Sequence, residues 1–270
     1  EVVVDHREMY AHASRVMHQN FSQTSEYLAL FRGALSYMKT DRIDLLVVGL
    51  PVSSLPTKTA YLKRRLEGMH PVAGGKTVTV NKVLVLAQPI GGFIHYSLSH
   101  GLYSQLRQSK NLIIDPGFFT VDWVLAMGLQ PIPQRCGTFA GGMHSVLRRV
   151  AQVISDEYQV NFDDYGALDQ SLRSGKLRLF GNDVDVEKYI PQAKPVVEEA
   201  VNAIVNSVGD GRDIDSIVLV GGGAQFFRDA VEHRFPLHRV WLVPDPVFSN
   251  VRGFQLAGEE IMSRKQATVV

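Results

Sequence analysis

The feature that most constrains the fold is residues 112–123, LIIDPGFFTVDW, which read as two strands joined by a short turn. An apolar strand ends in Asp115, the chain turns through Gly117, and a second strand carries Thr120 and Asp122. A carboxylate at a strand end beside a glycine turn can hold Mg²⁺ and phosphate together, because glycine lets backbone N–H groups approach a ligand. Aspartate before glycine is also common in ordinary turns, so this segment alone leaves both interpretations open.

The bulk composition excludes several classes of protein. The 28 Lys and Arg nearly balance the 27 Asp and Glu, so the chain lacks the net positive charge that would attract nucleic acid or an anionic membrane. We therefore expect no direct nucleic-acid binding. Cys136 is the single cysteine, which excludes an internal disulfide and favours a small core residue over a nucleophile. No apolar run has transmembrane length and the first residues have no signal core, so we expect a cytoplasmic protein without a membrane partner.

Helical and strand patterns alternate along the chain, which predicts an α/β fold. A helix over 22–39 leads into an apolar run over 43–50, which is typical of an interior strand buried on both faces. A helix over 89–107 precedes three consecutive strands. The other predicted segments are helices at 58–67, 142–158, 163–173, 187–207, from 224 to about 233 and from about 247, and strands at 76–80, 82–87, 111–115, 119–127, 132–138, 176–180, 214–220 and 239–243.

Glycine clusters mark the places where predicted strands give way to helices. They are Gly91 with Gly92, Gly141 with Gly142, and Gly221 with Gly222 and Gly223. A helix N-terminus offers free N–H groups and a positive dipole end to an anion, and glycine removes the side chain that would obstruct it. Glycines also close turns and cap helices, so each cluster alone fits either role. No cluster contains the GK[ST] of a Walker loop or a GxGxxG, which disfavours a P-loop NTPase and a Rossmann dehydrogenase.

Taken in order, six segments resemble the actin, Hsp70 and sugar-kinase superfamily, and within it the bacterial ParM/StbA-type plasmid-segregation actins, with the PRTRC system protein D branch nearest. The segments are VVGLP (47–51), VLAQPIGGFIHY (85–96), LIIDPGFFTVDW (112–123), CGTFAGGMHSV (136–146), IVLVGGGAQFF (217–227) and VPDPVFSNVRGFQLAG (243–258). The resemblance implies the actin-like ATPase fold, with two ribonuclease-H-like lobes whose mixed sheets are flanked by helices around a nucleotide cleft. Lobe I would be 1–110 plus 244–270, and lobe II 111–243.

In that family, the segment resembling 112–123 is the second phosphate loop. The resemblance implies that Asp115 is catalytic and holds Mg²⁺ through water, and that Gly117 and the backbone of Phe118 and Phe119 bind phosphate. Thr120, also at the phosphate loop, would brace the hairpin together with Asp122.

Gln88 matches the first connecting helix, where the family places a residue that orients the attacking water. Without the resemblance, a polar residue that caps the helix is an equal interpretation.

The segment IVLVGGGAQFF resembles the family's adenosine motif, so nucleotide binding is carried over to Gly221, Gly222 and Gly223. Gly141 and Gly142 would approach the sugar and phosphates from the other side. Asn250 and Gly253 match the second connecting helix and are expected to support the hinge. The hypothesis requires Asp115 and the glycine turns to converge on one crevice between the lobes.

The sequence departs from the family's pattern in two places. The first phosphate loop, an N-terminal hairpin with its own Asp and Gly, has no counterpart around residues 2–8, so the chain reads as starting after it and is expected to bind or hydrolyse nucleotide poorly. Pro116 has no N–H and Phe118 and Phe119 are bulky, which predicts the loss of one phosphate contact.

The function implied is a nucleotide-dependent, filament-forming ATPase that uses ATP or GTP with Mg²⁺. It would self-associate and act with a DNA-bound adaptor protein in plasmid segregation or maintenance. Two alternatives stay open: a phosphotransferase of the sugar-kinase or acetate-kinase type, and a nucleotide-binding scaffold that does not hydrolyse.

Overall fold

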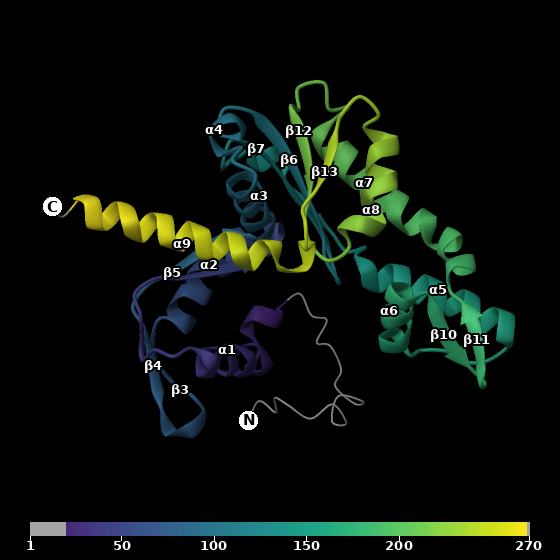
Figure 1. Cartoon of the computed structure of the whole chain (residues 1–270), viewed down its shortest axis with the longest axis horizontal. Coiled ribbons are helices and arrows are strands. Elements are labelled where there is room, and N and C mark those ends of the chain that lie inside the picture. The colour runs from purple at the N-terminus through teal and green to yellow at the C-terminus, as the bar shows by residue number, and fades with distance from the viewer. Residues whose placement is uncertain (1–19, 269–270) are drawn as a thin grey trace. The chain divides into compact units, whose positions relative to one another are not determined.

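The computed structural model describes residues 20–268, which fall into two compact units (Figure 1). One unit holds the described residues of 1–50 together with 54–86 and 254–268, and the other holds 51–53 and 87–253. The predicted lobe boundaries divide the chain at other points and stay a prediction. The predicted absence of an N-terminal hairpin falls in residues 1–19, outside the described residues.

The smaller unit combines short strands with two helices, α1 (Ser25–Tyr37) and α2 (Leu55–Leu66). Its strands are β1 (Arg42–Ile43), β2 (Leu46–Leu50), β3 (Gly68–Pro71), β4 (Thr77–Val80) and β5 (Val83–Ala87). β4 pairs in parallel with β1 and antiparallel with β3, while β2 pairs with β5. Thr24 caps α1, since its Oγ1 accepts the N–H of Tyr27 at 3.2 Å.

The run over 43–50 differs from its prediction. It forms two short strands, because the Asp44 carboxylate accepts from Arg42 Nε at 3.0 Å and from Asn81 Nδ2 at 2.7 Å and holds the chain in a bend. Within β2 only Leu50 is fully buried, so the prediction of a strand buried on both faces is wrong.

The larger unit is built on a mixed six-stranded sheet, as predicted, with the order β13-β12-β6-β7-β8 and β9 also paired to β7. β12 lies parallel to β6 and β13, and β7 runs antiparallel to β6, β8 and β9. The strands are β6 (Lys110–Pro116), β7 (Val121–Met127), β8 (Gln130–Pro131), β9 (Gly137–Phe139), β12 (Ser216–Leu219) and β13 (Val240–Leu242). A separate hairpin joins β10 (Lys176–Leu179) and β11 (Asn182–Asp185).

Helices cover both faces of this sheet (Figure 1). α3 packs on β6 and β7, whereas α7 contacts β7 and β9 and α8 contacts β6, β12 and β13. Leu112 and Ile114 of β6 belong to the core formed with α5, α7 and α8, and Ile113 between them is equally buried, so β6 is covered on both sides. The helices are α3 (Gln88–Ser99), α4 (Tyr103–Leu106), α5 (Met143–Tyr158), α6 (Tyr165–Ser174), α7 (Lys194–Val208), α8 (Ala224–Arg234) and α9 (Ser249–Thr268).

Some predicted elements are interrupted. The helix predicted over 89–107 is two helices, because the chain turns at Gly101, whose φ of +66° is left-handed. Of the strand predicted over 132–138, only the last residues form a strand, β9, because Pro133–Arg135 is a 3₁₀ turn; β8 ends before the predicted range. Within residues 20–268, no helix has the length and hydropathy that a membrane crossing requires.

Candidate functional site

Asp115 lies near the end of β6, directly opposite Asp122 on β7. Both carboxylates are buried, with 5% of Asp115 and 2% of Asp122 exposed. Burial raises the pKa of Asp115 to about 7, a hydrogen bond from Asn250 lowers it, and the nearby charge of Asp122 raises it. A carboxyl group that titrates near neutral pH at a strand end is a candidate functional group.

Asp122 braces the hairpin, as expected. Its Oδ1 accepts from the Val52 N–H at 2.8 Å and from Thr138 Oγ1 at 2.5 Å, and its Oδ2 accepts from Thr120 Oγ1 at 2.8 Å. Burial raises the pKa of Asp122, and these three hydrogen bonds lower it. Both oxygens of Asp122 are therefore engaged in structure.

The third glycine cluster lies against Asp115. Gly221 follows β12 with a φ of +77°, and a Cβ at this position would overlap Oδ1 of Asp115. The Gly223 N–H donates to the carbonyl of Pro116 at 2.7 Å. The backbone of the turn at 221–223 thus packs against the Asp115 side chain and the Pro116 carbonyl at the end of β6. Gly222 is exposed.

The β6–β7 loop and the start of α5 are joined by hydrogen bonds. The N–H groups of 142–144 donate to the carbonyls of 117–119 at 2.7–3.2 Å, so the first N–H groups of α5 are already used. Within the described chain, the N–H groups of Phe119 and Thr120 donate to no other residue. The loop itself, rather than the helix end, therefore offers donors to an anion.

Gly141 and Gly142 have a packing reason to be glycine. A Cβ at Gly142 would lie 2.6 Å from the carbonyl oxygen of Gly117, and one at Gly141 would overlap the ring of Phe139. Their predicted contact with a nucleotide stays a prediction.

The first glycine cluster lies inside α3 rather than before it, because the helix begins at Gln88. A Cβ at Gly92 would lie 2.6 Å from Val220, and a Cβ at Gly253 would overlap the carbonyl oxygen of Gly91. The expectation that this helix is entered through Gly91 and Gly92 is therefore wrong, and Gly92 and Gly253 permit close packing. Gln88 is half-buried and its side chain forms no hydrogen bond with another described residue, so its role toward water stays a prediction.

Asn250, in the first turn of α9, was not predicted to touch a functional group. Its Nδ2 donates to Oδ2 of Asp115 at 2.7 Å, and its Oδ1 accepts from the Gly92 N–H at 3.0 Å. The sequence signal for this contact was the amide of Asn250 itself, which can donate one hydrogen bond and accept another at the same time.

The oxygen ligands at Asp115 are too few to hold Mg²⁺ by themselves. They fit an Mg²⁺ ion that binds together with phosphate. Among the described residues, no group of three or more His, Cys, Asp or Glu could hold a metal. Oδ2 of Asp115 accepts from Asn250, whereas no described side chain donates to its Oδ1. Mg²⁺ commonly takes one or two carboxylates and completes its shell with water and phosphate oxygens, so one such oxygen is sufficient.

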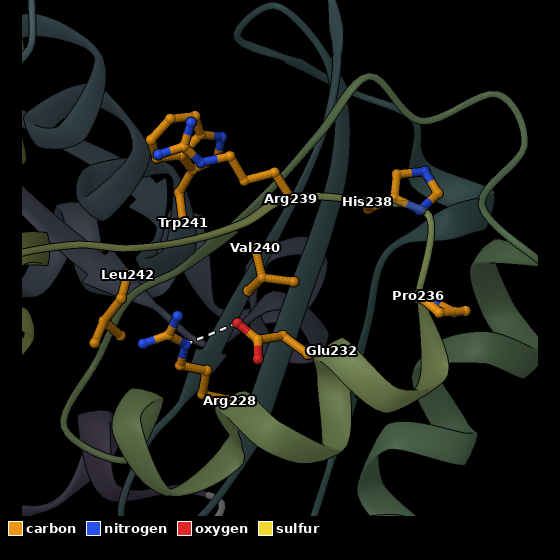
Figure 2. Close-up of a pocket in the computed structure, with 8 residues that line it drawn as sticks. All are labelled: Arg228, Glu232, Pro236, His238, Arg239, Val240, Trp241 and Leu242. Carbon is orange, nitrogen blue, oxygen red and sulfur yellow. Dashed lines mark hydrogen bonds and ion pairs between the residues drawn. The ribbon is translucent and has the colours of Figure 1, made fainter.

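A hollow of about 490 Å³ lies elsewhere, at the edge strand β13 and α8 (Figure 2). Arg239 stacks 3.6 Å over the ring of Trp241, and Arg228 Nε lies 2.8 Å from Glu232. The lining residues are Arg228, Glu232, Pro236, His238, Arg239, Val240, Trp241 and Leu242. It contains no residue that the sequence singled out for binding, and three of its charged side chains are engaged with neighbours.

Comparisons with known proteins agree on one fold. The family model "Actin like proteins N terminal domain" matches residues 3–91, and "Archaeal actin homologue MreB-like, C-terminal" matches 113–233. No curated protein matches in a sequence search.

Several solved structures are similar to this chain. Ta0583, an archaeal actin homolog in complex with ADP, has a TM-score of 0.75 at 18% identity, over 88% of this chain and 78% of that one. A pCBH ParM non-polymerisable quadruple mutant has a TM-score of 0.73 at 20% identity, over 89% and 77%. A 15-stranded ParM filament from Clostridium botulinum has a TM-score of 0.71 at 19% identity, over 89% and 75%. The predicted actin-like α/β fold is confirmed.

Proposed function

We propose that this chain, which belongs to the actin-like proteins, binds a nucleoside triphosphate, hydrolyses it and assembles into filaments. The observation that carries the proposal is the packing of the turn at 221–223 against the buried carboxylate of Asp115. Two segments far apart in sequence thereby place a carboxylate oxygen beside a glycine-lined backbone, which is the combination that Mg²⁺ and a polyphosphate need.

Each of these residues would have a separate role in nucleotide hydrolysis. Mg²⁺, when bound with the nucleotide, would neutralise phosphate charge. Oδ1 of Asp115 would hold its water shell, and the N–H groups of Phe119 and Thr120 would donate to phosphate oxygens. The carboxamide of Gln88 would orient the attacking water. Catalysis of this kind depends on positioning and electrostatics rather than covalent chemistry.

The similar structures support the proposal at a coarse level. One is described with ADP, one is a filament, and one is a ParM variant described as non-polymerisable. By analogy with ParM, we extend the proposal to a cytoplasmic protein that segregates or maintains plasmid DNA through a DNA-bound adaptor.

The first test measures phosphate release by the purified chain with Mg²⁺ and ATP or GTP, without any acceptor substrate. Asp115→Asn should lower kcat by at least ~10²-fold, because the neutral amide no longer holds the metal's water shell. Asp183→Asn, the same change at an exposed position of β11, should leave kcat unchanged. Sedimentation with and without nucleotide should show nucleotide-dependent pelleting.

Two outcomes would contradict this function. Phosphate transfer to a sugar or to acetate with negligible hydrolysis would indicate a phosphotransferase. Tight nucleotide binding with no turnover in either the unaltered chain or Asp115→Asn would indicate a scaffold.

A further inference from the structure

Asn250 makes two hydrogen bonds that only a carboxamide can make together. Its Nδ2 donates to Oδ2 of Asp115 and its Oδ1 accepts from the backbone N–H of Gly92. Because one partner is a carboxylate and the other an N–H, the orientation of the amide is fixed by its surroundings. The side chain therefore ties the end of β6 to the first turns of α3 and α9.

The position of Asn250 is also fixed by packing. Gly253, one turn further along α9, lies so close to α3 that a Cβ would overlap the carbonyl oxygen of Gly91. A Cβ at Gly92 would lie 2.8 Å from Oδ1 of Asn250. The two helices meet at glycine, and the amide has little freedom to move away from Asp115.

The hydrogen bond decides which oxygen of Asp115 stays available. Oδ2 is occupied by Asn250, whereas Oδ1 lies over Gly221. A carboxylate that is hydrogen-bonded through one oxygen presents the other oxygen in a single direction. Residues that bind a metal are usually oriented by such a hydrogen bond from a neighbouring residue.

Three elements near Asp115 carry charged or titratable groups. β7 supplies Asp122, which raises the pKa of Asp115. α3 supplies His95 and α9 supplies Arg252, and these two interact with each other, so that Arg252 helps to lower the pKa of His95. Arg252 also pairs with Asp245 at 2.6 Å. Asn250 is therefore the neighbour whose hydrogen bond favours the ionised form of Asp115.

We propose that Asn250 is a positioning residue for nucleotide hydrolysis, which holds Asp115 by Oδ2 so that Oδ1 faces the turn at 221–223. The inference rests on the proposed function of Asp115. It goes beyond it by assigning the orientation of the carboxylate to a residue of α9.

The test compares Asn250→Asp with Asn250→Ala. Asn250→Asp keeps the size of the side chain and an acceptor for the Gly92 N–H but replaces the amide donor to Asp115 with a second carboxyl group and its charge, whereas Asn250→Ala removes both hydrogen bonds and adds no charge. Each should lower kcat at pH 7 by about 10–100-fold with a much smaller change in KM, and should move the acid limb of the pH profile to higher pH. The sign follows because Asp115 acts ionised and each variant loses the donor that lowers its pKa. Asn202→Asp, at an exposed position of α7, is the control.

A second measurement does not depend on turnover: the pKa of Asp115, followed by carbon-13 NMR of the carboxyl groups in nucleotide-free protein. It should rise in Asn250→Ala, which removes the donor without adding a charge. An unchanged pKa, or an unchanged pH profile despite lower activity, would overturn the positioning role. An unaltered chain that shows no hydrolysis would instead overturn the proposed function. If Asn250→Ala fails to fold, Asn250→Leu, which is close in size to asparagine and adds no charge, takes its place in the test.

Discussion

At the scale of single residues, Gly221 is a position where the site tolerates little change. Its positive φ and its contact with Oδ1 of Asp115 both exclude a side chain. Gly221→Ala should therefore lower the free energy of unfolding by about 2–4 kcal/mol, from backbone strain and overlap together. Urea unfolding measures the stability, and titration with a fluorescent nucleotide should show weaker binding.

The neighbouring glycine supplies the matched control. At Gly222 a Cβ would meet only a side-chain carbon of Val247 at 3.7 Å, so Gly222→Ala should change stability by less than about 0.5 kcal/mol. Equal losses in the two variants would show that the contact with Asp115 does not matter.

Asp115 and Gly221 could be assigned to the site from the sequence, but the contact of Asn250 with Asp115 could not. A carboxylate at a strand end and a glycine run after a strand are local patterns. The hydrogen bond from Asn250 joins segments that no periodicity relates, and an asparagine at the start of a helix reads as a cap. The packing roles of Gly92 and Gly142 were missed for the same reason, since they depend on residues far away in the sequence.

At the scale of elements, β9 is tied to β7 through Thr138. Its hydroxyl donates to Asp122 and accepts from the Ser53 N–H at 3.1 Å. Thr138→Val keeps the shape but removes both hydrogen bonds and leaves a buried carboxylate short of a donor. We expect a loss of about 1–3 kcal/mol in urea unfolding.

Thr77→Val, the same change at an exposed position of β4, should have little effect on stability. A loss at Thr138 no larger than at Thr77 would contradict the bracing role.

Long apolar elements were predictable, and short polar ones were not. β6, β7, α5 and α8 follow from continuous or periodic apolar residues. β3 and β11, with the sequences GMHP and NDVD, have no such pattern and form only because a partner strand lies beside them. The predicted helix is interrupted at Gly101 and the predicted strand at Pro133, because these residues favour turns. The spacing of apolar residues does not reveal such turns.

At the scale of the whole molecule, Asp115 makes stability depend on pH. Its folded-state pKa of about 7 lies above the ordinary value of 3.8, so folding favours the protonated form. The stabilisation is complete below pH 4 and is lost as the pH rises through 7, a change on the order of 4 kcal/mol. Asp115→Asn should remove this dependence and be more stable than the unaltered chain at pH 8.

Urea unfolding at pH 5 and pH 8 measures the difference. Parallel stabilities of the two proteins across this range would show that Asp115 does not titrate as proposed. Asp122, whose pKa burial also raises, contributes in the same direction in both proteins.

Asp115, its support from Asn250 and Gly92, the turn at 221–223 and the loop at 117–120 all belong to the unit formed by 51–53 and 87–253. Their mutual contacts form when that unit folds, so they are preorganised. A nucleotide that binds there would not have to supply the entropy of arranging the carboxylate and the glycine backbone. More of its interaction energy would then remain to change the shape or the assembly of the protein.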